Sequence, residues 1–345
     1  MTRVLVAMSG GVDSSVAAAL LQRAGHDVVG VTMKLWGGAS DTGCCSVADV
    51  DDARRVAQQL GIDHYVFNFG DDFMDRVVGP YVADHGAGRT PNPCVECNRH
   101  LKFDLLLRRA DRLGFDAVAT GHHARVERDE NGGRWRLLRG ADGAKDQSYV
   151  LHMLGQAELA RVLLPVGAMV KDDARRLAGE LGLRTAAKPD SQDVCFITST
   201  GGRQEFLRER LPLHAGRVVD RDGRDVGTVP AVELVTIGQR KGLGLGGSPT
   251  PRYAVAVDVA ARTVTVGAED DLLTRSLVVE RMTWVDAPVA GEVEVQYSAH
   301  GAARAATFAD GVVRWSRPQR RVAPGQSVVL YRGDEVLGGG VASSS

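Results

Sequence analysis

The sequence predicts an α/β protein that begins with a doubly wound parallel sheet and ends in an all-β portion. In the first part, short apolar runs alternate with helical patterns at the spacing of βαβ units, and the first run leads through a glycine turn into a helix. From about Gly216 the helical patterns give way to short alternating runs and glycine-rich turns. With 345 residues, the chain is long enough for one large domain and one or two smaller ones.

Strands are expected where runs are apolar on both faces, and helices where apolar residues recur every three or four positions. The expected strands of the first part are Val4–Met8, Asp27–Met33, His64–Phe69 and Asp116–Thr120, with a hairpin at Val126–Leu138. The expected helices are Asp13–Ala24, Val47–Leu60, Asp71–Val82, Asn98–Leu113, Gln147–Leu154 and Lys171–Leu181. The later strands include Tyr253–Val259, Thr263–Val266 and Val293–Tyr297, and the tail Ala342–Ser345 is expected to be disordered.

Composition and charge indicate an ordinary soluble protein of the cytoplasm. The chain is 44% hydrophobic and 25% charged, and no apolar stretch reaches the length of a membrane span. Its net charge is −1, so a nucleic-acid partner must be held by local basic patches. The five cysteines are Cys44, Cys45, Cys94, Cys97 and Cys195. Their odd count and the lack of a secretion signal favour a reducing compartment and thiols kept for chemistry or metal.

The stretch Arg3–Ser15, RVLVAMSGGVDSS, predicts an anion site, most often one for phosphate. A buried strand, a glycine turn and a helix N-terminus direct several backbone N–H groups at one point. An ordinary tight turn capped by Ser14 or Asp13 is the structural alternative. A signal peptide is disfavoured because Gly10 and Gly11 interrupt the apolar run. The loop is not a Walker A motif, since it is shorter and has no lysine before the serines. Because ligands bind beyond the carboxyl ends of parallel strands, Met33 is expected beside this loop.

A Cys-x-x-Cys pair, Cys94 and Cys97, stands at the start of a predicted helix. The helix dipole and the nearby Arg99 and Lys102 favour thiolate, with a pKa below the roughly 8.5 of a free thiol. Half of a zinc site is the alternative, but Cys44-Cys45, or Cys195 with a histidine, lack the spacing of zinc-finger ligands. Cys195 lies in an apolar stretch, and taken alone it reads as a core cysteine.

Several motifs together carry a resemblance to a known family. They are SGGVDSS at the first loop, TPNPxxxCN at Thr90–Asn98, ATGH at Ala119–His122, KDQSY at Lys145–Tyr149, DSQDVCFI at Asp190–Ile197 and TIGQRKGLGLGG at Thr236–Gly247. In this order the chain resembles, from about Val4 to Gly340, the bacterial tRNA-specific 2-thiouridylases of the N-type ATP pyrophosphatase superfamily.

The resemblance implies an ATP-pyrophosphatase domain, a small central β-rich domain and a C-terminal β-barrel that binds tRNA. We expect their boundaries at 1–210, 211–272 and 273–345. It also implies that ATP, with Mg²⁺, adenylates the C2 oxygen of the wobble uridine. Sulfur from a cysteine persulfide then displaces AMP and gives 2-thiouridine. The implied partners are tRNA and a sulfur-donor protein such as a cysteine desulfurase.

The matching positions imply individual roles. Cys97 is the nucleophile and Cys195 carries the persulfide. The implied ATP-binding residues are Ala7, Met8, Ser9, Gly10, Gly11, Val12, Asp13, Ser14, Met33 and Gly121. The residues implied to contact the target base or the tRNA are Asn92, Pro93, Cys94, His122, Lys145, Asp146, Gln147 and Gln326.

Cys94 departs from the family pattern, in which much of the family has an aspartate proposed as acid or base. A thiol is a different proton carrier, so that role is open here. Alternatively, Cys94, Cys97 and Cys195 could hold three irons of a [4Fe–4S] cluster.

Two other function classes remain to be compared with tRNA thiolation. An amide-forming ligase of the GMP- or NAD-synthetase kind uses the same first loop but needs no paired reactive cysteines. A non-catalytic RNA-binding module would bind tRNA without releasing AMP. The cysteine motifs and KDQSY favour tRNA thiolation.

A basic run near the C-terminus is the candidate surface for tRNA. Its six arginines are Arg304, Arg314, Arg317, Arg320, Arg321 and Arg332, against one acid, Asp310. Arginine binds phosphate with a planar fork, and Trp315 is expected to offer a stacking surface. A second basic surface, Arg99–Arg112, flanks the nucleophile. The alternative is a solvated basic face.

Overall fold

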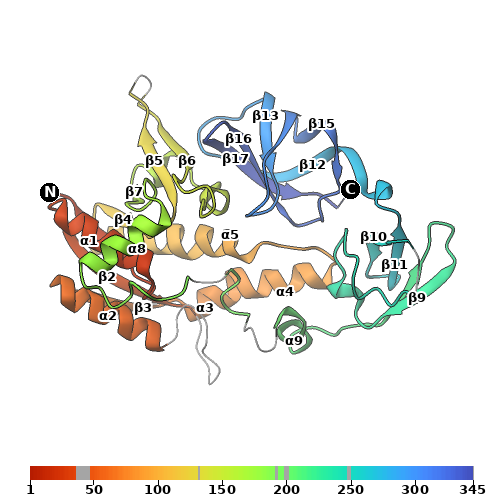
Figure 1. Ribbon diagram of the computed structural model, residues 1–345, viewed down its shortest axis with the longest axis horizontal. Coiled ribbons are helices and arrows are strands. Elements are labelled where there is room, and N and C mark those ends of the chain that lie inside the picture. Colours follow the sequence, from red (N-terminus) through yellow and green to blue (C-terminus); the bar gives the residue numbers. More distant parts are fainter. Residues whose placement is uncertain (36–46, 131–132, 191–192, 198–201, 247–249, 345) are drawn as a thin grey trace.

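The first part of the chain folds into a five-stranded parallel sheet with helices on both faces (Figure 1). The computed structural model describes residues 1–35, 47–130, 133–190, 193–197, 202–246 and 250–344. The strand order is β3-β2-β1-β4-β7, which puts β1 in the middle. The strands are β1 Arg3–Ala7, β2 Asp27–Lys34, β3 His64–Asn68, β4 Ala117–Ala119 and β7 Val162–Leu163.

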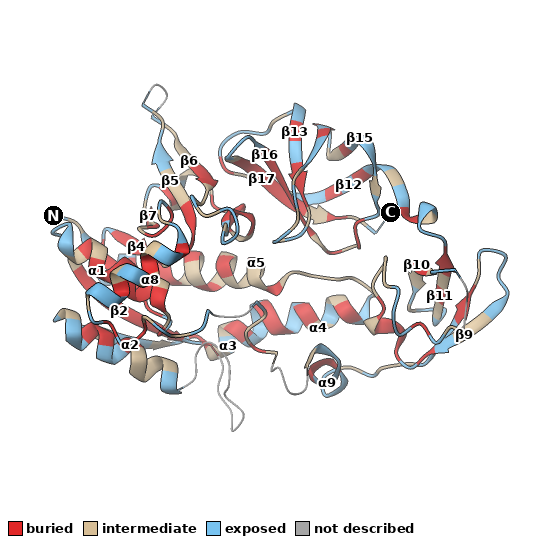
Figure 2. Cartoon of the chain, viewed as in Figure 1, coloured by how far each residue is buried: buried red, intermediate tan, exposed pale blue. Residues whose placement is uncertain are grey.

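Two hydrophobic cores lie on opposite faces of β1, because successive side chains of a strand point to opposite sides. Val4 and Val6 pack against three helices on one face, while Leu5 and Ala7 join the core on the other. The helices of the first face are α1 Val12–Arg23, α2 Val47–Leu60 and α8 Lys171–Glu180. Since both faces are covered, β1 is apolar and buried from Val4 to Ala7, and only Arg3 at its start is exposed. The neighbouring strands β2 and β4 are likewise drawn mostly as buried (Figure 2).

Two long helices run side by side beneath the barrel, and each has a π-helical middle (Figure 1). The first consists of α3 Gly70–Phe73, a π-helical segment Met74–Val78 and α4 Gly79–Gly86. The second consists of α5 Pro93–Cys97, a π-helical segment Asn98–Leu105 and α6 Leu106–Arg112. In a π-helix the hydrogen bonds join residues i and i+5, so residues five apart lie nearly above one another. The second helix therefore changes geometry directly after Cys97.

The rest of the chain forms two β structures. A four-stranded sheet has the order β10-β11-β8-β9 and its own core. A six-stranded barrel follows, closed because β12 pairs with both β15 and β17. The sheet contains β8 Gly216–Val219, β9 Asp225–Val229, β10 Tyr253–Asp258 and β11 Thr263–Gly267. The barrel contains β12 Leu273–Trp284, β13 Gly291–Gln296, β14 Arg304–Ala309, β15 Val312–Arg320, β16 Ser327–Arg332 and β17 Glu335–Ala342. Short helices α7 Gln156–Leu159 and α9 Gly202–Arg208 complete the fold, with 3₁₀ turns at Ser148–Leu151, Val232–Leu234 and Asp270–Leu272.

The predicted hairpin of the first part forms as β5 Ala124–Arg128 and β6 Trp135–Arg139, but it belongs to the barrel sheet. β6 pairs with the barrel strand β17, with Leu137 opposite Val336. Glu335 on β17 accepts hydrogen bonds from Arg134 at 2.7 Å and Arg136 at 3.0 Å. The barrel is thereby attached to the parallel-sheet part of the chain through a shared sheet.

A buried polar cluster secures this junction. The Arg139 guanidinium donates to Asp146 Oδ2 at 2.8 Å and to Gln296 Oε1 at 3.0 Å, and it lies 3.7 Å from the centre of the Tyr331 ring. Asp146 also accepts hydrogen bonds from the backbone of Gly140 and from Ser148. The side chain of Asp146 is 7% exposed.

Most expected elements form within a few residues of their predicted bounds, and three differ. The helix expected over Asp71–Val82 continues to Gly86. The helix expected over Gln147–Leu154 is only a 3₁₀ turn at Ser148–Leu151. The Asp146 carboxylate accepts a hydrogen bond from the Ser148 N–H and so favours a local turn over a helix. The disorder expected from Ala342 is wrong for the first residues of that tail, since β17 includes Ala342 and Ser343 N donates to Val278 O at 2.9 Å. Within the described ranges, no helix is long and apolar enough to cross a membrane.

Arg139→Ala is expected to lower the free energy of unfolding by roughly 3 kcal/mol, because it leaves the buried Asp146 carboxylate without its cation. Urea unfolding measures the change. Arg217→Ala is the control, since Arg217 and its partner Asp225 are 62% and 63% exposed and the loss should be much smaller. Equal losses in the two variants would contradict a stabilising junction.

Candidate active site

The loop after β1 gathers backbone N–H groups at the N-terminus of α1. Gly10 has φ +71°, and a Cβ there would lie 2.3 Å from the Asp49 carbonyl oxygen, so only glycine fits. Gly121 approaches from the end of β4, where a Cβ would lie 2.5 Å from Ser14 N. Ser14 Oγ accepts a hydrogen bond from Ser9 N at 3.2 Å and holds the turn. This cradle suits a phosphate group.

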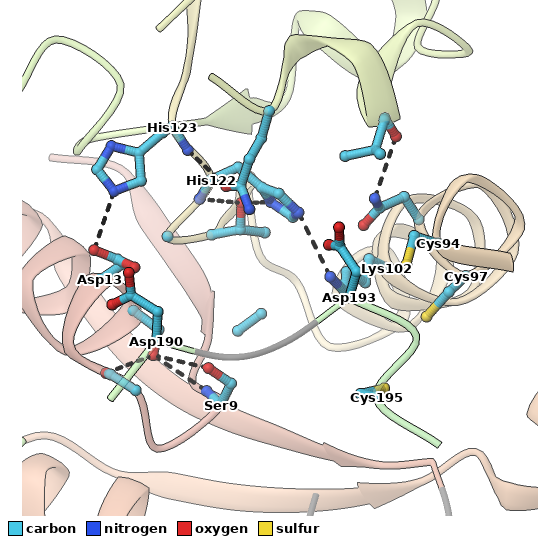
Figure 3. A pocket seen from close by; sticks show the side chains of 18 of the residues that line it. Ser9, Asp13, Cys94, Cys97, Lys102, His122, His123, Asp190, Asp193 and Cys195 are labelled. Atoms are coloured by element: carbon cyan, nitrogen blue, oxygen red, sulfur yellow. Dashed lines mark hydrogen bonds and ion pairs between the residues drawn. The ribbon is translucent and has the colours of Figure 1, made fainter. Parts of the chain in front are cut away.

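The cradle forms one end of a cavity of about 580 Å³ that also contains the cysteines (Figure 3). Of the predicted ATP-binding residues, all but Gly10 line it. The other predicted site residues that line it are Pro93, Cys94, Cys97, His122, Lys145, Asp146, Gln147 and Cys195. Asn92 and Gln326 do not: Asn92 caps α5 through Cys94 N at 3.1 Å, and Gln326 lies in the barrel loop before β16.

A chain of alternating charges runs along the cavity beside the cradle. The Lys171 ammonium contacts Asp13 Oδ2 at 2.6 Å and Asp190 at 2.9 Å, and Lys145 contacts Asp190 at 2.8 Å. His123 Nε2 donates to Asp13 at 3.1 Å. Burial alone would raise the pKa of Asp13, but the hydrogen bonds from His123 and Lys171 hold that pKa below its usual range. Burial likewise opposes ionisation of Asp190, whose pKa is held well below its usual range by hydrogen bonds from Lys145 and Lys171.

The KDQSY segment forms another part of the cavity wall, and hydrogen bonds to other residues of the protein hold its side chains in place. Lys145 is paired with Asp190, and this hydrogen bond raises the pKa of Lys145. Asp146 is enclosed in the junction with the barrel. Gln147 Oε1 accepts a hydrogen bond from the His123 backbone at 2.9 Å. The segment therefore links the loop after β4 with the cavity and the barrel.

Cys94 and Cys97 lie on α5, and the π-helical segment continues their face. Lys102 is five residues after Cys97, the spacing that a π-helix aligns. Cys94, Cys97, Asn98 and Lys102 all line the cavity, and Figure 3 shows the sulfurs of Cys94 and Cys97 on one helix. Arg99, which the sequence also suggested as a neighbouring cation, is 3.5 Å from Glu96.

Lys102 also fixes the state of His122. Its ammonium can only donate, so His122 Nε2 accepts at 3.5 Å and His122 Nδ1 carries the proton that bonds Thr120 Oγ1 at 2.6 Å. Burial, followed by the Lys102 charge, lowers the pKa of His122 far below its usual value. The imidazole is therefore neutral at physiological pH.

Cys195 lies on a strained segment across the cavity from α5. Val194 has φ +54°, which is unfavourable for a β-branched residue, and its N–H lies 3.4 Å from Cys94 Sγ. Phe196 anchors the segment by edge-to-face contacts with Phe73 at 5.5 Å and Phe206 at 5.1 Å. Cys195 itself is half-buried and lines the cavity, so the plain core position is wrong.

The barrel contributes the last part of the wall. Ala299 and His300, between β13 and β14, line the cavity. His300 Nε2 lies 3.4 Å from Asp193 Oδ2, two residues before Cys195. A loop of the barrel is thus in contact with the segment that carries this cysteine.

Sequence reasoning missed several cavity residues: His123, Lys171, Asp190, Asp193 and the buried Asn98. Lys171 had a signal, because a lysine in the first turn of a helix opposes the helix dipole. Cys44, Cys45, Ser191, Gln192, Thr198 and Gly247 lie outside the described residues. Among the described ones, no group of three His, Cys, Asp or Glu side chains is placed to hold a metal ion. The iron–sulfur cluster stays a prediction.

The fold and the cradle define a nucleotide-binding protein of the HUP class. Family models match residues 2–199 as a tRNA methyl transferase HUP domain, 204–268 as a tRNA methyl transferase PRC-barrel domain and 274–342 as an aminomethyltransferase beta-barrel domain. These matches confirm the expected order of a parallel-sheet part, a small β-rich part and a β-barrel.

Full-length relatives identify the family. The chain is 46% identical to tRNA-specific 2-thiouridylase MnmA of Heliobacterium modesticaldum, over 98% of this chain and 91% of that one. It is 49% identical to the protein of the same name from Chloroflexus aurantiacus, over 99% and 98%. The chain belongs to the tRNA-specific 2-thiouridylase family. A similar solved structure, the U34-tRNA thiolase NcsA from Methanococcus maripaludis with its [4Fe-4S] cluster, is 19% identical over 60% of this chain and 65% of that chain, with a TM-score of 0.39.

Lys171→Met is expected to lower ATP affinity by roughly tenfold or more, because two carboxylates then face the phosphate cradle without their shared cation. Titration calorimetry measures the affinity. The control is Arg176→Met on the same helix, where the arginine side chain is 67% exposed and ATP binding should not change. Unchanged affinity in Lys171→Met would show that this lysine does not serve the cradle.

Proposed function

We propose that the protein replaces the C2 oxygen of the wobble uridine of tRNA with sulfur, using ATP to activate the oxygen. The observation that supports this most is that the phosphate cradle and three cysteines share one cavity. A reaction that first activates an oxygen with ATP and then displaces it with sulfur needs both groups within reach of one substrate atom. The full-length similarity to 2-thiouridylases supports the same activity.

In the first half of the reaction, ATP occupies the cradle made by Ala7–Ser14 with Met33 and Gly121. The uridine oxygen attacks the α-phosphorus, and pyrophosphate leaves. Lys171 offsets the charge of the phosphates. Asp13 and Asp190, whose carboxylates share the Lys171 ammonium, would provide oxygen ligands of the kind that Mg²⁺ prefers, and the bound ion would supply screening of the triphosphate charge.

In the second half, Cys195 carries a persulfide loaded by a sulfur-donor protein. Its terminal sulfur attacks C2 of the adenylated base, and AMP leaves with the C2 oxygen. Cys97 thiolate then attacks the Cys195 sulfur. The bond from that sulfur to the transferred one breaks, and its electron pair remains with the product as 2-thiouridine. A thiol reductant must restore the resulting Cys97–Cys195 disulfide in every cycle.

Lys102 would support this chemistry, since it follows Cys97 at the five-residue spacing that a π-helix aligns and lines the same cavity. A neighbouring positive charge favours thiolate over thiol. Cys94 replaces the aspartate of many relatives and would lie against the base, together with Asn92 and Pro93. Iron analysis of anaerobically purified, active protein separates this role from the cluster alternative.

The tRNA would be held by His122, Lys145, Gln147 and Gln326, with Asp146 positioning the KDQSY segment from inside the barrel junction. We propose domain boundaries at 1–210, 211–272 and 273–345. The hairpin β5–β6 belongs to the first domain in sequence while its strands complete the sheet of the third.

The basic run offers fewer RNA contacts than its sequence suggested. Trp315 is 5% exposed and packs in the barrel core, so the expected stacking surface is wrong. Arg320 pairs with Glu269, and Arg321 donates to the backbone of Val255 at 3.4 Å, so both serve the contact between the barrel and the central sheet. Arg314 and Arg317 on β15 are exposed and have no ion pair among the described residues, which makes them the better candidates for phosphate contacts.

Cys97→Ser and Cys195→Ser are both expected to abolish 2-thiouridine formation, because each removes one sulfur of the relay. The assay incubates tRNA with protein, ATP, Mg²⁺ and a persulfide donor, and mass spectrometry of the digested tRNA detects the product. Wild-type turnover should release AMP and pyrophosphate. ATP affinity is the control and should change little in either variant. Product at the wild-type rate from either variant, or ADP in place of AMP, would overturn the mechanism.

Arg314→Glu combined with Arg317→Glu is expected to weaken tRNA binding and to flatten its salt dependence by about two units, one for each lost phosphate contact. Filter binding at several salt concentrations measures both. The matched control reverses two exposed arginines that also have no ion pair among the described residues, Arg23→Glu with Arg55→Glu on α1 and α2, and should preserve the slope. An unchanged slope in the β15 variant would remove the barrel from the RNA surface.

A further inference from the structure

Asn98 carries a buried side-chain amide in the wall of the cavity, and among the described residues its oxygen has no hydrogen-bond donor. The residue is 2% exposed and directly follows Cys97. Its Nδ2 donates to the Val150 carbonyl oxygen at 3.2 Å. Its Oδ1 is buried and has no hydrogen-bond partner among the residues that the structure describes. Buried polar atoms are nearly always satisfied, so an orphaned acceptor in a cavity wall indicates a ligand group.

The orientation of this amide is fixed by its neighbour. Val150 presents a carbonyl oxygen, which can only accept, so the NH₂ group of Asn98 must face it. Rotating the amide by half a turn would set two acceptors against each other and leave two donors unused. The side that remains for a ligand is therefore an acceptor, and the complementary ligand atom is a donor.

The proposed substrate has one such donor at the reacting edge. Uracil carries N3–H between its two carbonyl groups, whereas cytosine carries a bare acceptor nitrogen at the same position. Both bases have the C2 oxygen, so activation of that oxygen cannot by itself separate them. A site that must thiolate one base and not the other needs a group that distinguishes N3–H from N3.

We propose that Asn98 Oδ1 accepts the N3–H of the target base, so that Asn98 selects uracil over cytosine. This inference rests on the proposed function for the identity of the substrate. It adds a residue beyond those that the sequence motifs assign to the base. An unpaired acceptor also rejects cytosine actively, because its N3 lone pair would face the lone pairs of Oδ1. A site built to bond a substrate N–H discriminates strongly against an analogue that lacks it.

The test compares tRNAs that carry uridine or 3-deazauridine at the wobble position, since 3-deazauridine replaces N3–H by C–H in nearly the same shape. Wild-type protein and Asn98→Leu are each measured for tRNA affinity without ATP and for the single-turnover rate of thiolation. The uridine-to-deazauridine ratio in wild type, divided by that in the variant, cancels intrinsic differences between the bases. One quotient is obtained for tRNA affinity and one for the thiolation rate, and we expect their product to be roughly 10 to 100.

Gln156→Leu is the control. This amide bonds two backbone carbonyls, Trp135 O at 2.8 Å and Val285 O at 2.9 Å, and does not line the cavity. Its ratios should equal those of wild type. Unfolding midpoints show whether Asn98→Leu is folded, and Asn98→Ser repeats the comparison if it is not.

The outcomes distinguish failure of base selection by Asn98 from failure of the proposed thiolation activity. If the wild-type and Asn98→Leu ratios are equal for both affinity and rate, while wild type still forms 2-thiouridine, Asn98 does not recognise N3–H. If wild type forms no 2-thiouridine but its affinity ratio depends on Asn98, the proposed function fails and the base-reading role stands. Efficient thiolation of a cytidine-bearing tRNA by wild type would also overturn the selection.

Discussion

One buried ammonium group, that of Lys171, connects the parts of this active site. It lies between Asp13, at the start of the helix behind the phosphate cradle, and Asp190, five residues before Cys195. A charge buried this deeply is stable only beside its counter-charges, so the ion pairs hold the cradle and the Cys195 segment together. Any anion that enters the cradle meets the same ammonium. Phosphate occupancy and the position of the Asp190 segment are therefore electrostatically linked.

The second organising contact is the junction between the parallel-sheet part and the barrel. Asp146 belongs both to this junction and to the wall of the cavity, which its neighbours Lys145 and Gln147 also line. The barrel also reaches the cavity through His300, which faces Asp193. The barrel is thus part of the active-site wall rather than a separate module tethered by a linker. A substitution at the junction is consequently expected to affect the residues that line the cavity.

The sequence predicted the parallel sheet, its helices and about half of the residues that line the cavity, because β1 and the glycine loop have local signatures and further motifs carry the family resemblance. Gly10 and Gly121, for example, have no room for a Cβ because other backbone atoms approach them closely, and a requirement for glycine at a fixed position is visible in a short sequence motif. What the sequence did not reveal depends on distant partners. The hairpin β5–β6 looked like a local unit, but its partner strand β17 lies some two hundred residues later in the chain. Trp315 and Arg320 looked like surface groups because an alternating strand pattern does not say which face closes a barrel or meets a neighbouring sheet.

The backbone irregularity after Cys97 explains how one helix supplies so much of the site. Continued α-helical geometry would turn Lys102 away from the face that carries the cysteines, because residues five apart are not aligned in an α-helix. The π-helical segment brings Lys102 back to that face and leaves Asn98 beside Cys97. Its poorer backbone geometry is offset by packing, since Leu101, Phe103 and Leu106 are almost completely buried in the adjacent core. The same helix that stabilises the fold on one side therefore presents the Cys97 thiol, a cation and a hydrogen-bond acceptor to the cavity on the other.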